Sequence, residues 1–299
     1  MYCITPIDGE KLELSRFSLD PFIDSIEGVF KEIRDVYDQL WNSSVSLKGF
    51  ESLHQKIVKY KSQQNSVDLT SYPVGFCFPI TQFCFAILTE YPQYLSENTR
   101  LITDYLSRGG TLKIIWGDLR SEYFQTAIQL GVWYIDVAYD AIDRNKPKVR
   151  CARFSDSGFK DIASLSQYIS IKEPYHKGKV YVNNLFPRLF PKYPLLFLSD
   201  DGRLSIDDSP YFSMLGERSK EWLEEYFSSD KVQKLPKSTI DQVAIAIQKF
   251  SKNYLLKELI LFEESTPQEL MRNVDHDKTK LSPEKTKAVN NVNFVLSTL

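Results

Sequence analysis

Apolar residues recur every three or four positions over several stretches of the chain, and this spacing predicts amphipathic helices. The strongest pattern begins at Asp20-Pro21, a capping residue followed by proline at the first helical position, and continues to Trp41. The same spacing, with its start and stop residues, predicts further helices at about 47–61, 79–90, 96–108, 118–131, 159–169, 217–227 and 239–262.

Short apolar runs bounded by turn residues predict strands at 111–116, 132–137, 148–154, 195–199 and 203–206. The last two flank Asp200-Asp201-Gly202, a hairpin signal because glycine readily takes the positive φ that such a turn requires. Helix and strand alternate between residues 96 and 137, an order that favours a sheet with parallel pairing.

These elements predict an α/β or α+β fold with a helical N-terminal segment, a central mixed or parallel sheet flanked by helices, and a helical C-terminal cap. The expected boundaries are 1–66 for the N-terminal segment, 67–235 for the central body, 236–263 for the C-terminal helices and 264–299 for a mostly mobile polar tail. One domain overall is expected, because no linker rich in Gly, Ser or Pro separates the pieces.

Composition narrows the choice of partners. With 37 basic and 39 acidic residues the net charge is −2, so no nucleic-acid partner is expected. The apolar window from Val74 to Leu88 is interrupted by Pro79, Thr81 and Gln82 and is too short to span a bilayer, so no membrane partner is expected either. The N-terminus lacks the features of a secretory signal, and a cytoplasmic location follows as an expectation.

The cysteines and histidines do not indicate a metal site. Four cysteines show no C-x-x-C spacing, and three histidines lie far apart, so no metal centre is predicted and the cofactor stays unknown. Free thiols in a reducing compartment are the natural interpretation.

Cys77 is the first candidate for chemistry. It follows a Pro-Val-Gly turn and precedes a predicted helix, whose dipole would lower the thiol pKa, a setting found in cysteine hydrolases and acyltransferases. His176 is the candidate base and Asn183 the candidate orienting residue. Asn184, Asp200 and Asp207 compete with Asn183 for that role. The substrate would be small and polar, or peptide-like. A buried structural thiol and a surface histidine are the alternatives.

Asp136 and Asp140 form a second candidate site, for a divalent cation or a polar substrate. They would lie at a sheet edge, or on one helix face four residues apart. Aspartate is also common at strand ends and helix caps. Arg120, after Trp116-Gly117-Asp118, could add charge to an anion-binding loop, although one glycine alone makes a weak nucleotide motif.

A third hypothesis is a noncatalytic interaction or effector protein. Residues 181–212 combine aromatic and basic side chains and could meet a protein partner, as could the C-terminal tail. The same aromatics would also serve simply to pack over a sheet.

Overall fold

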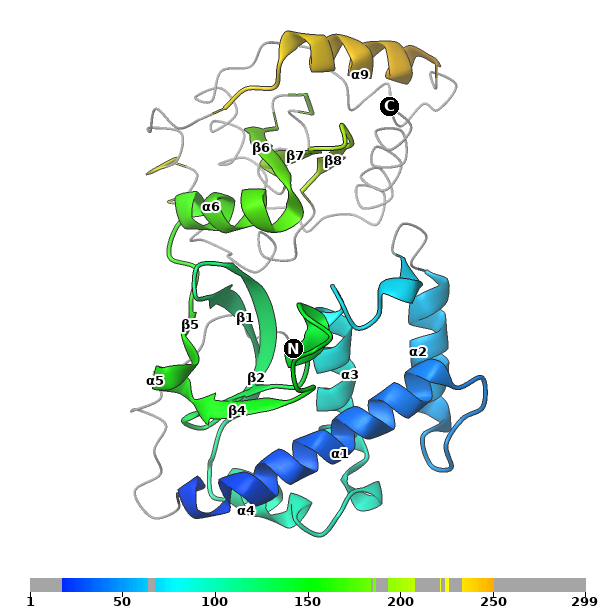
Figure 1. Cartoon of the computed structure of the whole chain (residues 1–299), viewed down its shortest axis with the longest axis vertical. Helices are drawn as coiled ribbons and strands as arrows, with labels where there is room; N and C mark the ends of the chain where they lie inside the picture. The colour runs from blue at the N-terminus through cyan, green and yellow to red at the C-terminus, as the bar shows by residue number, and fades with distance from the viewer. Residues whose placement is uncertain are drawn as a thin grey trace. The chain divides into compact units, whose positions relative to one another are not determined.

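The computed structural model describes residues 18–63, 68–183, 185–186, 193–207, 221, 224–225 and 233–249. The chain divides into two compact units, Met1–Asp161 and Ile162–Leu299. Each unit is described by itself below (Figure 1).

The first unit combines helices with one antiparallel sheet. Its helices are α1 (Ile23–Asn42), α2 (Glu51–Ser62), α3 (Cys77–Glu90), α4 (Thr99–Ser107) and the short α5 (Phe154–Ser157). Its strands are β1 (Leu112–Leu119), β2 (Tyr123–Leu130), β3 (Trp133–Asp136), β4 (Arg150–Arg153) and β5 (Phe159–Lys160). Short 3-10 turns lie at Asp20–Phe22, Leu69–Ser71, Pro92–Tyr94 and Tyr139–Ala141.

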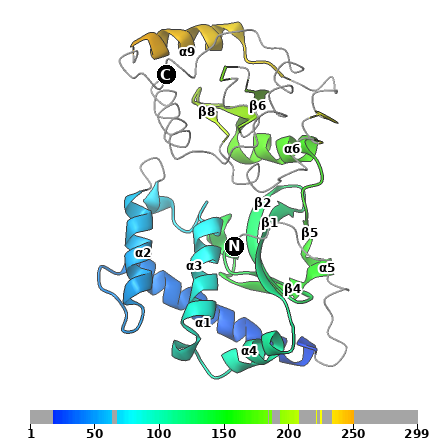
Figure 2. The same ribbon diagram turned by 180° about the vertical axis from the view of Figure 1, so that it is seen from behind.

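Helix α1 provides one side of the hydrophobic core. Ile26, Phe30, Ile33 and Tyr37 follow one another at helical spacing and are fully buried. The helix packs against α2, α3 and α4, and α3 lies against β2 and β1 (Figures 1 and 2). This arrangement brings Phe83 of α3 against Tyr37 of α1, with stacked rings at a centroid distance of 5.9 Å, and the segment that follows β3 against Arg34.

Helices and strands occur together as expected, but the sheet is antiparallel and not parallel. Its strand order is β4-β3-β2-β1-β5, and every neighbouring pair runs antiparallel. The prediction of parallel pairing is wrong because the segment expected as the helix 118–131 is strand β2. A three-residue turn, Arg120-Ser121-Glu122, joins β1 to β2, and so short a connection can only link antiparallel strands.

The reason for this error lies in the burial of β2. Every residue of the strand is buried, so its sequence lacks the alternation of apolar and polar positions that marks a half-exposed strand. Phe124, Ala127 and Ile128 happen to follow a helical spacing. Asp118, at the start of the helix expected over 118–131, lies within β1 and accepts a hydrogen bond from the backbone N–H of Ser121 at 2.5 Å.

The second unit contains a smaller antiparallel sheet. Strands β6 (Gly178–Val182), β7 (Leu195–Ser199) and β8 (Leu204–Ile206) pair in the order β6-β7-β8. The predicted hairpin between β7 and β8 is confirmed, with Gly202 at φ +88°. Helix α6 (Leu165–His176) packs against β6, and it begins six residues later than the predicted helix 159–169. Residues 159–160 instead form β5 of the first unit.

Only part of the predicted C-terminal region lies within the described residues. Helix α9 (Lys237–Lys249) begins where the C-terminal helices were expected, and residues 250–299, including the predicted tail, lie outside the described residues. The cap itself therefore stays a prediction. Among the described residues no helix is long and apolar enough to cross a membrane.

Candidate functional site

A buried ion pair joins α1 to the segment that follows β3. The Arg34 guanidinium donates to the two carboxylate oxygens of Asp140, at 2.7 Å from Nη1 and 3.0 Å from Nη2. Nη1 also donates to the carbonyl oxygen of Val137 at 2.8 Å. The side chains are 1% and 8% exposed. Burial alone would lower the pKa of Arg34, but the hydrogen bond to Asp140 and the surrounding negative charges together outweigh it, and the pKa is raised.

Further polar groups extend this pair towards the surface. Arg34 Nε donates to Asp38 at 3.0 Å, and Tyr72 donates its hydroxyl hydrogen to the same carboxylate. Lys148 closes the outer side with ion pairs to Asp38 at 2.7 Å and Asp35 at 2.8 Å. The side chains that hold α1 against the loop before β4 are Arg34, Asp35, Asp38, Tyr72 and Lys148. Both carboxylate oxygens of Asp140 accept from Arg34.

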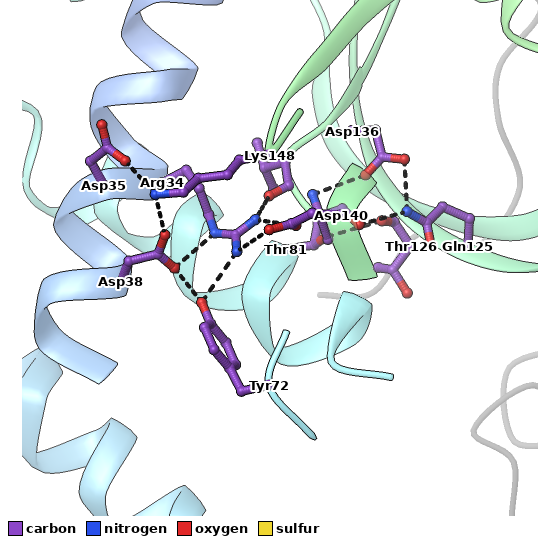
Figure 3. Close-up of polar contacts among 12 residues, drawn as sticks. Arg34, Asp35, Asp38, Tyr72, Thr81, Gln125, Thr126, Asp136, Asp140 and Lys148 are labelled. Carbon is purple, nitrogen blue, oxygen red and sulfur yellow. Dashed lines mark hydrogen bonds and ion pairs between the residues drawn. The ribbon is translucent and has the colours of Figure 1, made fainter. Parts of the chain in front are cut away.

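Asp136 is the centre of a second buried polar group, at the end of β3. Gln125 Nε2 donates to Asp136 Oδ2 at 2.7 Å, and the Tyr134 hydroxyl donates to the same oxygen at 3.1 Å. The backbone N–H of Ala138 donates to Oδ1 at 2.9 Å. Figure 3 shows most of this group beside the Arg34 contacts.

The environment of Asp136 changes its acidity. Burial raises the pKa of Asp136 to about 6, and the hydrogen bonds from Gln125, Ala138 and Tyr134 act in the opposite direction without cancelling the effect. The carboxylate is 0% exposed and Gln125 is 1% exposed. Within the described residues Gln125 Oε1 has no hydrogen-bond partner. Asp136 is therefore a carboxyl group able to exchange a proton close to neutral pH.

Cys77 lies near this second group, as the first residue of α3. Its thiol is 4.0 Å from the hydroxyl of Thr126 in β2, the residue that follows Gln125. Thr81, one turn further along α3, donates to the Thr126 carbonyl oxygen at 3.0 Å and holds the helix against the strand. Burial raises the pKa of the Cys77 thiol, and the negative charge of Asp136 adds to the rise, whereas contacts with Thr126 lower it. The direction is opposite to the one predicted from the helix dipole.

The predicted partners of Cys77 belong to the second unit. His176 ends α6, where its ring packs edge-on against Phe197 at a centroid distance of 6.0 Å. The residue is exposed, yet lost solvation of the ring and the charge of Lys172 lower its pKa to about 4. Asn183 is buried, donates to the carbonyl oxygen of Tyr193 at 2.7 Å and accepts from the N–H of Phe186 at 3.0 Å. The pairing of Cys77 with these residues stays a prediction.

The two aspartates predicted as one site occupy neighbouring but separate polar groups. Asp140 is held by Arg34, and Asp136 by Gln125, Tyr134 and Ala138. No group of three or more His, Cys, Asp or Glu side chains suited to a metal ion occurs in the described part of the chain.

Arg120 does not precede a helix as predicted. It lies in the β1–β2 turn, where its N–H donates to the carbonyl oxygen of Gly158 at 3.1 Å. The expected anion-binding loop at 116–120 is therefore mostly strand β1, and it offers no helix N-terminus.

Most residues of these groups are not indicated by the sequence pattern, among them Arg34, Gln125 and Tyr134. Arg34 carried one detectable signal, because it lies four residues after Phe30 on the apolar side of α1, where a charge demands a buried partner. Gln125 and Tyr134 carried none, since their role depends on which strands are neighbours.

Comparisons with known protein families, with curated proteins and with solved structures find no match to this chain.

Proposed function

We propose that the protein is a cysteine-dependent enzyme, a hydrolase or group transferase, that acts on a small polar or peptide-like substrate with Cys77 as its nucleophile. The observation that carries this proposal is the position of the thiol. Cys77 begins α3, its thiol lies 4.0 Å from the Thr126 hydroxyl of β2, and the negative charge of the buried Asp136 carboxylate acts on it. Enzymes with an activated nucleophile place it near an acid–base group whose position is fixed by further hydrogen bonds.

In the proposed reaction the Cys77 sulfur attacks a substrate carbonyl carbon and forms a thioester. The bond to the leaving amine or alcohol breaks, and the leaving group takes up a proton. Water or a second acceptor then cleaves the thioester and restores the thiol. Because burial raises the thiol pKa, the free thiol needs a base, and Asp136 with a pKa of about 6 has a suitable affinity for the proton.

Three thiols within the described residues, Cys77, Cys84 and Cys151, are free. Unpaired thiols support the proposal of a cytoplasmic location, where cysteines stay reduced. Cys84 is fully buried, so Cys77 and Cys151 are the more accessible of the three.

The test is acylation of the native full-length chain by p-nitrophenyl acetate, with each acetylated cysteine identified by peptide mass. We expect Cys77 to be acetylated well before Cys84 and Cys151, and Asp136→Asn to slow the reaction by about tenfold or more. Cys151→Ser is the matched control and should leave the rate at Cys77 unchanged.

Two outcomes would contradict the proposal in whole or in part. If Cys77 reacts only after the protein is unfolded in urea, it is a structural core residue and the proposal fails. If Cys77 reacts readily but Asp136→Asn has no effect, Cys77 remains the nucleophile and Asp136 is not its base.

A further inference from the structure

Two basic side chains approach the ring of Tyr139, in the turn that follows β3. Lys146 Nζ lies 5.1 Å from the ring centroid, and the Arg150 guanidinium carbon lies 5.4 Å from it. The backbone supports this arrangement, since the Tyr139 N–H donates to the carbonyl oxygen of Lys148 at 3.1 Å, midway in sequence between the two cations. All three side chains are partly buried.

One donor nitrogen of the Arg150 side chain lacks a hydrogen-bond acceptor. Its Nη1 atom is buried and has no hydrogen-bond partner among the described residues. A buried donor on a charged group costs more free energy than a neutral one when it is left unpaired. Stacking on Tyr139 offsets part of that cost, because a guanidinium is attracted to the face of an aromatic ring. It does not supply the missing acceptor.

The nearby carboxylates are engaged elsewhere. Asp136 is the direct partner of Arg150 in the β3–β4 pairing, yet its oxygens accept from Gln125, Tyr134 and Ala138. Asp140 is held by Arg34 in the same way. Within the described residues, neither Arg150 nor Lys146 forms an ion pair with an acidic side chain. Two cations therefore converge on one ring without a protein anion between them.

We propose that Arg150 and Lys146 form a binding site for an oxyanion, the phosphate or carboxylate group of a ligand. Arginine suits this role, because its planar fork matches both groups with two parallel hydrogen bonds, while lysine adds a mobile point charge. The site lies where the loop at 142–149 joins β4, the edge strand of the sheet. It does not depend on a catalytic role for Cys77.

The test is isothermal titration calorimetry on the full-length chain with inorganic phosphate and, separately, with acetate, each against sodium chloride at equal ionic strength. We expect saturable binding of at least one anion, weakened about tenfold or more by Arg150→Gln and to a smaller degree by Lys146→Gln. Lys160→Gln, at an exposed lysine in β5, removes the same charge from a different place and should leave the affinity unchanged.

The choice of anion identifies the ligand class. Phosphate binding without acetate binding indicates a phosphorylated ligand, and the reverse indicates a carboxylate. If neither anion binds saturably, or if Lys160→Gln weakens binding as much as Lys146→Gln does, the proposal is wrong. Should Arg150→Gln fail to fold, Arg150→Lys, which keeps the charge but loses the fork, and Lys146→Gln decide the matter.

Discussion

The Arg34 guanidinium and the Asp140 carboxylate form a buried bidentate ion pair, with contacts of 2.7 and 3.0 Å between side chains that are 106 residues apart in sequence. The pair connects α1 to the turn after β3, and its guanidinium also binds the Val137 carbonyl oxygen at the end of that strand. The position of Asp136, one residue earlier, therefore depends on a contact made by the first long helix of the chain.

Removing one partner of this pair should be strongly destabilising. Arg34→Met leaves the Asp140 carboxylate buried without its main donor, and we expect a loss of about 3–5 kcal/mol of unfolding free energy, measured by urea denaturation. The double variant Arg34→Met, Asp140→Leu should lose less than Arg34→Met alone. Lys56→Met, which breaks an exposed pair with Glu90, should cost less than about 1 kcal/mol. Equal losses for Lys56→Met and Arg34→Met would contradict this account.

Asp136 should make stability depend on pH in a defined direction. Burial raises its pKa in the folded chain to about 6 from 3.8, so the folded state binds the proton more tightly than the unfolded state. This stabilising contribution is complete below 3.8 and is lost as the pH rises through about 6. The total change is about 3 kcal/mol.

The measurement is the unfolding free energy of the natural chain minus that of Asp136→Asn across this pH range. His176 titrates in both proteins, so its contribution cancels in the difference. Asp104→Asn, at an exposed position of α4, should reproduce the natural profile. A flat difference for Asp136→Asn would show that Asp136 titrates normally.

The β1–β2 turn contains a site for stabilisation. Arg120 and Ser121 both take left-handed backbone conformations, with φ of 61° and 60°. Non-glycine residues are strained there, so Ser121→Gly should raise the unfolding free energy by about 1 kcal/mol. Ser170→Gly in the exposed middle of α6 should lower it by about 0.5–1 kcal/mol. Thermal or urea unfolding distinguishes the two, and a loss at position 121 would mean that the hydroxyl contact with Asp118 matters more than the strain.

The second unit has a buried polar contact that can be tested in the same way. Tyr168 in α6 donates to Asp207, just after β8, at 2.8 Å, and Lys172 pairs with the same carboxylate at 3.0 Å. Tyr168→Phe should therefore cost about 1.5–3 kcal/mol, the usual value for a hydrogen bond to a charged group. Tyr181→Phe is the matched control, because no hydrogen bond of its hydroxyl occurs within the described residues, and it should change stability by less than about 0.5 kcal/mol.

The local sequence pattern was sufficient to predict helix α1 and the β7–β8 hairpin. Helix α1 confirms the spacing of its apolar residues from Ile26 to Tyr37, and the β7–β8 hairpin confirms the signal at Asp200-Asp201-Gly202. In α1 the side facing water differs in composition from the side facing the core, so periodicity identifies the helix. The hairpin is identified by its turn residues, because Gly202 takes the positive φ that the turn requires.

Only the tertiary structure decided the identity of β2, the antiparallel order of the sheet and the polar groups around Asp140 and Asp136. A strand buried on both faces has no alternating pattern, so Tyr123–Leu130 could not be distinguished from a helix by its periodicity. The partner of a buried charge is set by packing between distant segments, and the sequence around Arg34 contains no information about Asp140. The sequence by itself determined which residues can carry chemistry, and the fold determined which of them meet.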